Sequence, residues 1–410
     1  MYGLYNIGIY FYSLIILVVS LWNKKAGLFR RGRKHGYKQW EIIGQDGAPV
    51  AWFHCSSLGE FEQGRPLMEA YRNRFPAHKI LLTFFSPSGY EIRKNYTGAD
   101  WVLYLPLDTP RNARRFVTTV KPKIVIFIKY DFWHNLLHAL KKQAIPVYVA
   151  SAIFRPPQAF FQWYGGFFRK MLHAYRYLFV QNEASKELLA SIGITNVFVT
   201  GDTRFDRVWQ LAQTPEKLPV IENFSAGQPT IIAGSTWLAD EEKLAAAFAV
   251  LPANTKLVIV PHEIHEEHLA AIAKYFAPFG VTRYSMGRGA RDTGDSLVHR
   301  VLVLDTIGML SSVYRYGTVA YIGGGFGAGI HNTLEAAVYG IPVVFGPNYQ
   351  RFREAGDLIS QGGAACYTTG KELAGILQKW LAGNHAGNTN RQYVAQHCGA
   401  TEAILKLLQG

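Results

Sequence analysis

One short stretch of the chain combines residue types that can move protons, the sequence HCSSLGE at residues 54–60. It ends an apolar run that predicts a strand, and helical spacing follows it. A carboxylate in such a turn faces the open edge of a sheet, where Glu60 could act as a general base toward a hydroxyl group. A first-turn carboxylate that only complements the helix dipole fits the position equally well. No GxSxG elbow is present, so His54 is interpreted as a structural histidine at the strand end.

A second stretch has the character of a ligand-binding loop, YIGGGFGAGIHNTLE at residues 321–335. Glycines let the backbone approach a ligand closely, and a helix opening near Asn332 would favour an anion. The spacing is not the dinucleotide motif GxGxxG, and no Walker lysine follows. Glu335 could accept hydrogen bonds from ribose hydroxyls or could only cap the helix, and the glycine loop favours the ligand role. His331 is either a phosphate donor or a polar turn residue, and residues 305–309 could add a second wall.

Short apolar runs alternate with helical patterns along most of the chain. Nearly continuous apolar runs are typical of parallel strands that are buried on both faces. The predicted strands are Val50–Ser56, Lys79–Phe85, Lys123–Ile128, Pro146–Ser151, Tyr177–Gln181, Val197–Gly201, Thr230–Gly234, Lys256–Pro261, Arg300–Leu304, Val319–Gly323 and Pro342–Gly346. This alternation predicts an α/β fold of two Rossmann-like domains, with ligands at the carboxyl ends of the strands.

The chain of 410 residues is long enough for two domains. Thr214-Pro215, Leu218-Pro219 and Ser225-Ala226-Gly227 interrupt the alternation at residues 207–228, which predicts a linker there. We therefore expect one domain at 23–206 and a second at 229–410, after an N-terminal segment at 1–22.

Positive charge is concentrated in the first half of the chain. Residues 1–205 hold 27 Lys and Arg against 12 Asp and Glu, whereas residues 206–410 hold 16 against 17. A basic half beside a neutral half indicates an anionic partner for the first half, and nucleic acid, anionic lipid or a phosphorylated substrate would all fit. Three well-separated cysteines fit neither a zinc site nor a disulfide framework, and no acidic or His cluster has metal-ligand spacing.

The first 22 residues carry no charged side chain and favour a membrane partner. At ~1.5 Å per residue, the apolar stretch 4–22 reaches roughly 28 Å, enough to cross the hydrocarbon core. A basic cluster follows directly, so the positive-inside rule places the rest of the chain in the cytoplasm. A cleaved signal peptide would carry its basic residues before the apolar run, and a buried or interfacial helix is the other alternative. The aromatic, basic segment 160–178 is either a core helix or a second membrane-surface helix.

The complete pattern resembles the Kdo transferases (3-deoxy-D-manno-octulosonic acid transferases) of lipopolysaccharide biosynthesis. The resemblance covers nearly the whole chain, through the anchor and the stretches HCSSLGE, FFSPSGYE, KYDFWHN, GDTRFD, VPHEIH, LDTIGML and GGGFGAGIHNTLE. It implies a two-domain GT-B-like enzyme anchored on the cytoplasmic face of the inner membrane. Residues 1–22 would be its membrane anchor, 23–206 its acceptor-binding domain and 229–410 its nucleotide-sugar-binding domain.

The resemblance also assigns roles to particular residues. It implies that Glu60 is the general base, with Asp131 and Arg204 near the transition state. Nucleotide contacts map to Pro261, His262, Ile307, Gly308, Met309, Asn332, Thr333, Leu334 and Glu335.

The chain departs from the family pattern at three places. The family usually has two acids around a Thr before the Trp, whereas this chain has Lys129, Tyr130 and Asp131. Where the family usually has Pro-Arg-His-Pro, His262 stands in for the stronger cation. Met309 departs from the usual Met-Gly-Glu, which would leave that contact to its backbone.

The expected reaction is the inverting transfer of Kdo from CMP-Kdo to a hydroxyl of a lipid A precursor, lipid IVA. The expected partners are that donor, that lipid and an anionic membrane surface, with no nucleic acid, no metal and no further cofactor. A UDP-sugar 2-epimerase of the same architecture is an alternative, although its soluble substrate needs no anchor. A membrane-tethered protein that only binds an anionic ligand is another, but it would leave the glycine loop and Glu335 without a role.

Overall fold

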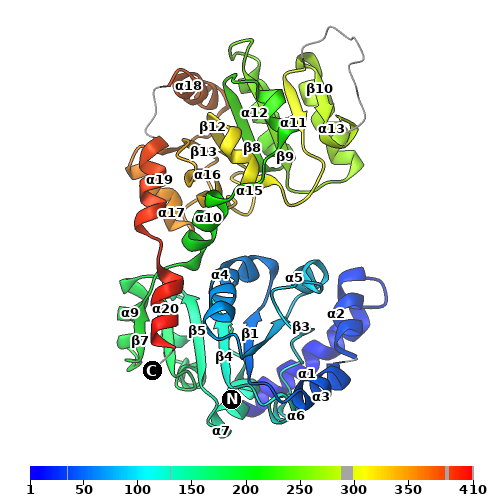
Figure 1. The fold of residues 1–410 in the computed structure, drawn as a ribbon, viewed down its shortest axis with the longest axis vertical. Coiled ribbons are helices and arrows are strands. Elements are labelled where there is room, and N and C mark those ends of the chain that lie inside the picture. Colours follow the sequence, from blue (N-terminus) through cyan, green and yellow to red (C-terminus); the bar gives the residue numbers. More distant parts are fainter. Residues whose placement is uncertain (35, 130, 288–298, 384–386, 409–410) are drawn as a thin grey trace. The chain divides into compact units, whose positions relative to one another are not determined.

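The computed structural model describes the whole chain except residues 35, 130, 288–298, 384–386 and 409–410. The chain forms two compact units, of which the first comprises Met1–Arg207 and Cys398–Gly410 and the second Val208–His397. Each unit is built around a seven-stranded parallel sheet with helices packed on it (Figure 1). The predicted fold of two Rossmann-like α/β domains is therefore confirmed.

The sheet of the first unit has the order β3-β2-β1-β4-β5-β6-β7. Its strands are β1 (Val50–Cys55), β2 (Lys79–Phe84), β3 (Trp101–Tyr104), β4 (Ile124–Ile128), β5 (Val147–Ala152), β6 (Tyr177–Val180) and β7 (Val197–Val199). Alternate side chains of β1 enter separate apolar clusters, with Trp52 in one and Phe53 in the other. Both faces of this sheet are thus covered, as the near-continuous apolar runs predict.

The register of the central strands brings their carboxyl ends to one edge of the sheet. Cys55 of β1 lies opposite Phe84 of β2, and His54 lies opposite Phe127 of β4. Residues that follow β1, β2 and β4 are therefore neighbours in space although they are about 30 to 75 positions apart in the sequence.

Helices connect the strands of the first unit and cover its sheet. They are α1 (Tyr2–Val19), α2 (Lys24–Lys34), α3 (Gly36–Gln45), α4 (Leu58–Arg74), α5 (Pro87–Arg93), α6 (Pro110–Val120), α7 (His134–Lys142), α8 (Gly166–Leu172), α9 (Glu183–Ala190) and α20 (Ala400–Leu407). Helix α10 (Thr203–Gln213) begins in the first unit and ends in the second. Helix α6 shows how local sequence sets the ends: Thr109 caps the first turn, Pro110 opens it, and Lys121 closes it in the left-handed conformation.

The second unit repeats the same design with the sheet order β10-β11-β9-β8-β12-β13-β14. Its strands are β8 (Thr230–Thr236), β9 (Lys256–Pro261), β10 (Val281–Arg283), β11 (Val301–Val303), β12 (Val319–Ile322), β13 (Val343–Phe345) and β14 (Ala364–Cys366). Its helices are α11 (Pro219–Ser225), α12 (Leu238–Phe248), α13 (Glu266–Phe276), α14 (Tyr284–Gly287), α15 (Leu310–Val313), α16 (Leu334–Ala337), α17 (Arg353–Ser360), α18 (Gly370–Leu381) and α19 (Gly387–Gln396).

The unit boundaries differ from the predicted domains at two places. The predicted linker 207–228 carries the end of α10 and helix α11, and all of it after Arg207 belongs to the second unit. The C-terminal helix α20 packs against α4 of the first unit, where Ile404 and Leu405 join the apolar cluster (Figure 1). Two backbone N–H groups near its start also bond Asp206. Turn-forming residues indicate that the alternation of strands and helices is interrupted. They do not indicate with which unit the interrupting segment packs.

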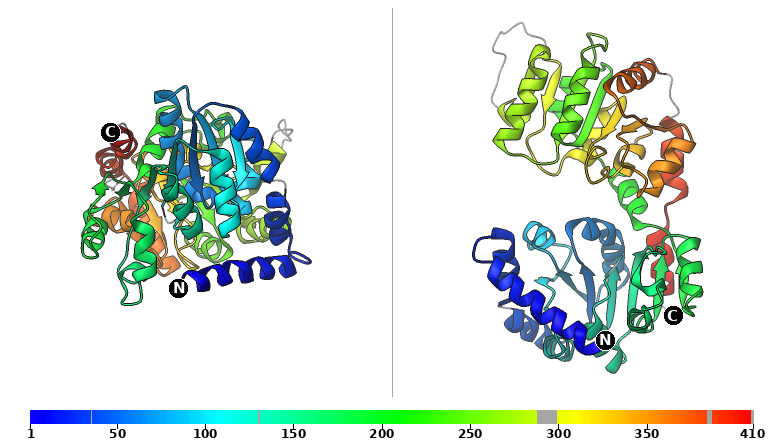
Figure 2. Two further views of the ribbon diagram at one scale, coloured as in Figure 1. Left: turned by 90° about the horizontal axis from the view of Figure 1, so that it is seen from below. Right: turned by 180° about the vertical axis from the view of Figure 1, so that it is seen from behind.

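Helix α1 is the one helix among the described residues that is long and apolar enough to cross a membrane by length and composition. It runs along the outside of the first unit (Figure 2). The Tyr5 hydroxyl donates to Asp108 at 2.6 Å, and the Asn135 amide donates to Asn6 at 2.9 Å. One face of α1 is therefore bonded to the protein while most of its large apolar side chains remain exposed.

Candidate functional site

Glu60 lies at the carboxyl edge of the first sheet, in the turn that joins β1 to α4. Ser57 has an extended backbone, with φ −141° and ψ 176°, and redirects the chain into the helix. Its hydroxyl donates to Glu60 Oε2 at 2.9 Å. The Glu60 side chain is only partly buried, so one carboxylate oxygen is held by Ser57 while the group stays accessible to a substrate hydroxyl.

Asp131 follows β4 at the same edge and is buried beside the β1 turn. Ser56 Oγ donates to its Oδ1 at 2.5 Å, and its Oδ2 lies 3.5 Å from Nε2 of His54. Burial, helped by the charge of Glu60, raises the pKa of Asp131 to about 8. Burial also lowers the pKa of His54 to about 3, so near neutral pH this is a contact between two uncharged groups rather than an ion pair.

His54 is held in place from its other ring nitrogen. Its Nδ1 shares hydrogen bonds with the Thr83 hydroxyl at 2.8 Å and the Thr83 carbonyl at 3.0 Å. The ring is therefore fully buried at the end of β1, in agreement with the interpretation of His54 as a structural histidine. Its Nε2 lies beside the Asp131 carboxyl group.

The raised pKa of Asp131 predicts a pH-dependent contribution to stability. Between its ordinary value of 3.8 and about 8, the folded protein holds a proton that the unfolded chain releases. The contribution of this group to the free energy of unfolding is therefore largest below pH 3.8 and falls as the pH rises toward 8. In the Asp131→Asn variant the group no longer titrates, and Asn can still accept from Ser56.

We expect the stability of Asp131→Asn relative to the parent protein to increase between pH 5 and pH 8, by up to about 4 kcal/mol at 1.36 kcal/mol per pKa unit. Denaturant unfolding of both proteins at several pH values measures this, because the other titrating groups cancel in the difference. A difference that stays constant over this range would show that Asp131 titrates normally.

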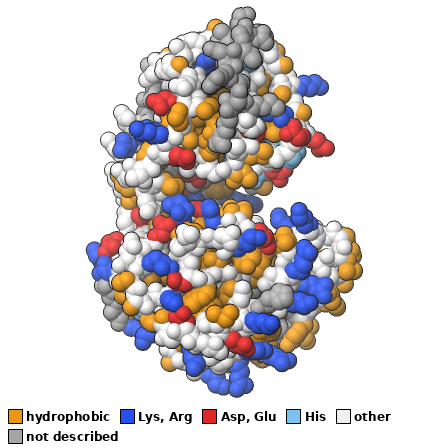
Figure 3. Space-filling model, turned by 45° about the vertical axis from the view of Figure 1, so that its right-hand side comes forward, with side chains coloured by type: hydrophobic (Ala, Val, Ile, Leu, Met, Phe, Trp, Pro, Cys, Tyr) orange, Lys and Arg blue, Asp and Glu red, His pale blue; other side chains and the backbone are white. Residues whose placement is uncertain are grey.

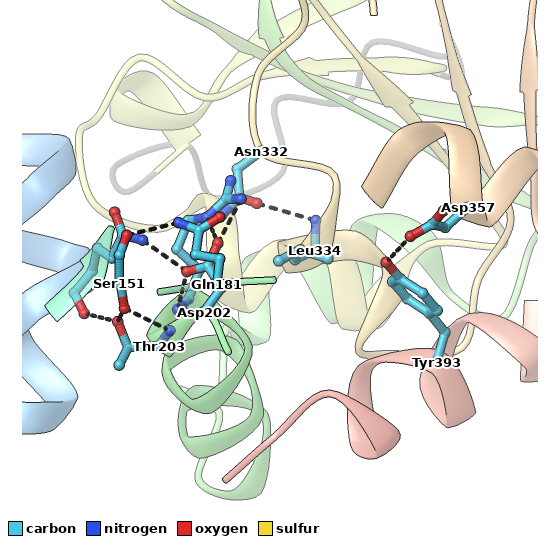
Figure 4. A network of polar contacts seen from close by, with 10 residues as sticks. Ser151, Gln181, Asp202, Thr203, Asn332, Leu334, Asp357 and Tyr393 are labelled. Atoms are coloured by element: carbon cyan, nitrogen blue, oxygen red, sulfur yellow. Dashed lines mark hydrogen bonds and ion pairs between the residues drawn. The ribbon is translucent and has the colours of Figure 1, made fainter. Parts of the chain in front are cut away.

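Arg204 reaches the same edge from the loop after β7. Its Nε and Nη2 each lie 2.8 Å from Oδ2 of Asp202. Gln63 of α4 donates to the other Asp202 oxygen at 2.8 Å, which ties this loop to the helix that carries Glu60. The segment that carries Asp202 is also bonded to β5, because Ser151 Oγ and Thr203 Oγ1 are 2.8 Å apart. Gln181, which follows β6, donates to the carbonyl of the same Ser151 (Figure 4).

Lys129 completes this group of charges from the end of β4, where its φ of 73° turns the chain out of the strand. Burial lowers its pKa, Arg204 lowers it further, and Glu60 opposes the shift. The Lys129 ammonium therefore lies within the electrostatic reach of both the predicted base and the predicted arginine. Tyr130, the middle residue of that departure from the family pattern, lies outside the described residues.

In the second unit, three rings stack at the carboxyl edge of the sheet. The His262 ring follows β9 and lies 4.7 Å from Trp237 and 4.4 Å from His331. Trp237 Nε1 donates to His331 Nε2 at 3.3 Å. Burial, together with His262, lowers the pKa of His331 to about 4, so His331 is a neutral ring whose Nδ1–H remains as its donor.

The glycine loop has a different role from the predicted one at two positions. A side chain at Gly323 would meet the backbone of Ser235 at 2.2 Å, and one at Gly325 would meet the backbone of Gly346 at 2.6 Å. These glycines let the loop approach the protein's own backbone rather than a ligand. Gly327 is exposed and has open space around it, so it keeps the predicted freedom to approach a ligand.

The residues Asn332 to Glu335 form a compact turn rather than the start of a long helix. Asn332 Oδ1 accepts from the Leu334 N–H at 3.1 Å, and its amide donates to Glu335 Oε1 at 3.0 Å (Figure 4 shows the Asn332–Leu334 contact). Thr333 and Leu334 are buried, and Glu335 is partly exposed. Since α16 is a single turn, its dipole is too short to explain Glu335 as a helix-terminus carboxylate.

The remaining predicted nucleotide contacts follow β9 and β11 at this edge. Pro261 is buried at the end of β9. Ile307 is 89% exposed, and Gly308 has a φ of 99°, which favours glycine. The Thr306 hydroxyl lies 3.1 Å from the Met309 sulfur, which fixes that side chain locally.

The structure thus groups Glu60, Asp131 and Arg204 at the carboxyl edge of the first sheet. It places the predicted nucleotide contacts at the end of β9, in the segment after β11, and in the turn that leads from β12 into α16. Sequence reasoning missed Ser57 and Trp237. Ser57 lies in the turn after β1 and Trp237 directly follows β8. This position after a strand is the one feature of the sequence that could have identified them as site residues. Among the described residues, no three His, Cys, Asp or Glu side chains could together hold a metal ion.

Comparisons with known proteins agree on one family. Residues 22–207 match the family profile described as 3-deoxy-D-manno-octulosonic-acid transferase (kdotransferase). The 3-deoxy-D-manno-octulosonic acid transferase of Bordetella pertussis is 28% identical over 98% of both chains. The protein of the same name from Aquifex aeolicus is 27% identical over 76% of this chain and 80% of its own.

A solved structure confirms the fold alone. UDP-GlcNAc 2-epimerase from Neisseria meningitidis, bound to UDP-GlcNAc, superposes with a TM-score of 0.58 at 15% identity, over 88% of this chain and 99% of its own. The two Rossmann-like units thus form a GT-B-like fold. Because proteins of different activity share this fold, the similarity in sequence is the more specific of the two comparisons. The chain is thus similar to 3-deoxy-D-manno-octulosonic acid (Kdo) transferases along nearly its whole length, and its first half matches the model of that family.

Proposed function

We propose that this protein transfers Kdo from CMP-Kdo to a hydroxyl of lipid IVA, with inversion at the anomeric carbon. The similarity of the chain to Kdo transferases supports Kdo transfer in lipopolysaccharide biosynthesis. The observation that carries the proposal is the placement of Glu60, a partly accessible carboxylate held by Ser57 at the carboxyl edge of the first sheet. An acceptor hydroxyl needs a base in this kind of position.

In the proposed reaction, the acceptor oxygen attacks the anomeric carbon while its proton passes to the Glu60 carboxylate. The bond from that carbon to the phosphate oxygen breaks, and CMP leaves from the opposite face. The Lys129 ammonium interacts electrostatically with both Glu60 and Arg204, so it could act on anionic groups there. Asp131, being uncharged near neutral pH, adds no repulsion beside the acidic sugar.

The second unit would hold the nucleotide at its own carboxyl edge. Glu335 would accept from the ribose hydroxyls, with Asn332 fixing its carboxylate. The stacked rings of Trp237, His262 and His331 would supply hydrogen-bond donors and flat surfaces to the donor substrate. Pro261, Ile307, Gly308, Met309 and Thr333–Leu334 would supply backbone contacts. The proposal requires no metal or further cofactor and no nucleic acid.

We further propose that α1 attaches the protein to the cytoplasmic face of the inner membrane. The outward face of α1 exposes large apolar side chains, including Leu4 at 68%, Ile7 at 65% and Phe11 at 62%. The basic residues of α2 follow it directly, as expected for a cytoplasmic flank. The bonds of Tyr5 and Asn6 to the first unit favour a helix held along the protein with its apolar face in the lipid.

Deletion of residues 1–22 should release the protein from membranes and leave part of its activity on acceptor dispersed in detergent. Asp108 would lose Tyr5 but keep the backbone N–H groups of Asn135 and Leu136, so the unit should stay folded. Membrane fractionation at high salt, with the full chain as control, measures the release. A truncated protein that remains bound would make residues 160–178, where Trp163 is 92% exposed, the main attachment.

Mass spectrometry of the products formed from CMP-Kdo and lipid IVA tests the proposed function. We expect the acceptor mass to increase by one or more Kdo residues, with CMP released. An epimerase would instead convert a UDP-sugar with no lipid present, and a binding protein would yield no product. Either of these results would overturn the proposal.

A further inference from the structure

A cavity of about 490 Å³ lies on the first unit between α2, α3 and the loop after β3. Four cationic side chains line it: Arg30, Arg31, Arg33 and Lys34. The opposite wall is made of ring and apolar side chains, with Trp40 and Tyr104 among them. On the face drawn in Figure 3, Lys and Arg side chains gather beside apolar ones at the end of the first unit where α1 and α2 lie.

The cations of this cavity have no acidic counterpart. The chain holds no Asp or Glu before Glu41. Within the part of the chain that the structure describes, none of the ion pairs involves Arg30, Arg31, Arg33 or Lys34. Four like charges around one hollow repel one another unless an anion enters it.

Arg33 forms the floor of the cavity and is held rigidly. Its guanidinium donates to the backbone carbonyls of Leu105 and Phe85 at 2.8 and 2.6 Å, and it lies 3.5 Å from the centre of the Phe29 ring. Burial lowers its pKa, which shows that this cation is poorly solvated. Gly32 makes the position possible, because a side chain there would meet the Tyr104 ring at 2.0 Å.

The cavity lies at the same edge of the sheet as the predicted base. Phe85 follows β2 and Leu105 follows β3, so Arg33 bonds the carboxyl ends of two strands beside β1. The charge of Arg33 also acts on His54, the ring that contacts Asp131. A ligand bound here would therefore lie beside the edge that holds Glu60.

An apolar hollow of about 330 Å³ adjoins the cavity on the side of α1. The two hollows share Arg30, Arg33 and Leu107. The second is otherwise lined by Phe29 of α2 and by α1 residues such as Leu14 and Leu17. One of the two adjoining hollows is thus cationic and the other apolar. The apolar hollow lies against α1, the helix that we propose to contact the membrane. This pairing matches an amphiphile with an anionic head.

We infer that the cavity lined by Arg30, Arg31, Arg33 and Lys34 binds the phosphate group of a membrane lipid, whose acyl chains run along α1. Arginine suits this ligand because its planar donors match phosphate oxygens. A polynucleotide would also meet positive charge, but the apolar hollow beside the cavity favours a lipid. The site is distinct from the nucleotide-binding loops of the second unit.

Binding of fluorescent phosphatidic acid to the full chain in neutral detergent micelles tests the inference through fluorescence anisotropy. We expect saturable binding that weakens roughly tenfold or more in R30Q/R31Q/K34Q, the scale of losing hydrogen bonds to a charged group. The three substituted side chains are exposed, so the variant should unfold at the parent temperature. R30K/R31K keeps the charge and should recover part of the affinity.

The matched control is K121Q/K141Q/K142Q, which removes the same charge from exposed positions outside the cavity. We expect it to change the affinity by less than about twofold. Equal weakening in both triple variants would indicate general charge attraction and would overturn the site. Displacement by inorganic phosphate, or by a short oligonucleotide, at concentrations as low as those of the lipid would also overturn it.

A second measurement rests on the proposed function. With CMP-Kdo, R30Q/R31Q/K34Q should raise the KM for lipid IVA about tenfold more than the KM for an acceptor without phosphates. Equal KM changes for both acceptors would mean that the cavity holds a bilayer lipid rather than the acceptor. The affinities for phosphatidic acid would still show whether the cavity binds a lipid phosphate at all. Absence of any transfer by the parent protein would reject the proposed function and leave the binding measurement intact.

Discussion

Replacing Glu60 by Gln should reduce kcat by ~10²–10⁴-fold, the usual contribution of a general base. Gln keeps the shape of Glu and can still accept from Ser57, but it cannot take a full proton from the acceptor hydroxyl. The fold and the affinity for CMP should be unchanged, because all the predicted nucleotide contacts belong to the second unit. Turnover with CMP-Kdo and lipid IVA, thermal unfolding and CMP titration together measure the effect.

Glu183→Gln is the matched control for this variant. Glu183 also lies in the first turn of a helix in the same unit and is exposed. A first-turn carboxylate that only complements the helix dipole contributes roughly 0.3–1 kcal/mol to stability. If Glu60 had only that role, both variants would melt slightly earlier and keep normal turnover. The next candidate for the base would then be Asp131, but its raised pKa would require the activity to increase with pH toward 8.

The strands that the sequence did not predict share a position in the fold. They are β3, β10 and β14, of three or four residues each, and all three lie at the edge of a sheet. An edge strand is covered on fewer sides, and β10 is only partly buried along its length. Its residues therefore need no continuous apolar run, which was the pattern used to find the central strands.

The positions of the site residues were more predictable than their surroundings. The turn from β1 into α4 places Glu60 by local sequence alone, because strand, turn and helix are consecutive. The environment of Asp131 depends on the pairing of β1 with β4, which brings His54 and Ser56 to a residue 75 or more positions away. No local pattern encodes that pairing, so neither the burial nor the raised pKa of Asp131 was predictable.

The charge around Glu60 shows the same limit. The sequence showed that Lys129 stands where relatives usually have an acid, but not what this cation meets. The structure places Lys129 within electrostatic reach of Glu60, in the first turn of α4, and of Asp202 and Arg204, at the start of α10. The glycine loop is a further example, since Gly323 and Gly325 pack against backbone contributed by β8 and by the end of β13.

Replacing Glu335 by Ala should weaken CMP binding by roughly 1.5–3 kcal/mol, the scale of losing hydrogen bonds to a charged group. This corresponds to a Kd that is about 10 to 150 times larger. Glu335→Gln keeps one acceptor oxygen and the bond from Asn332, so its loss should be intermediate. Isothermal titration of the full chain with CMP measures all three affinities.

Glu242→Ala is the control, because Glu242 is an exposed carboxylate on α12 of the same unit. It should leave the Kd for CMP unchanged. The alternative role of Glu335 as a helix-terminus carboxylate predicts a small loss of stability and normal CMP affinity, and the single turn of α16 makes even that loss small. A folded Glu335→Ala protein with the parent affinity would therefore remove Glu335 from the nucleotide site. The stacked rings of Trp237, His262 and His331 would then be the groups of this edge left to hold the nucleotide.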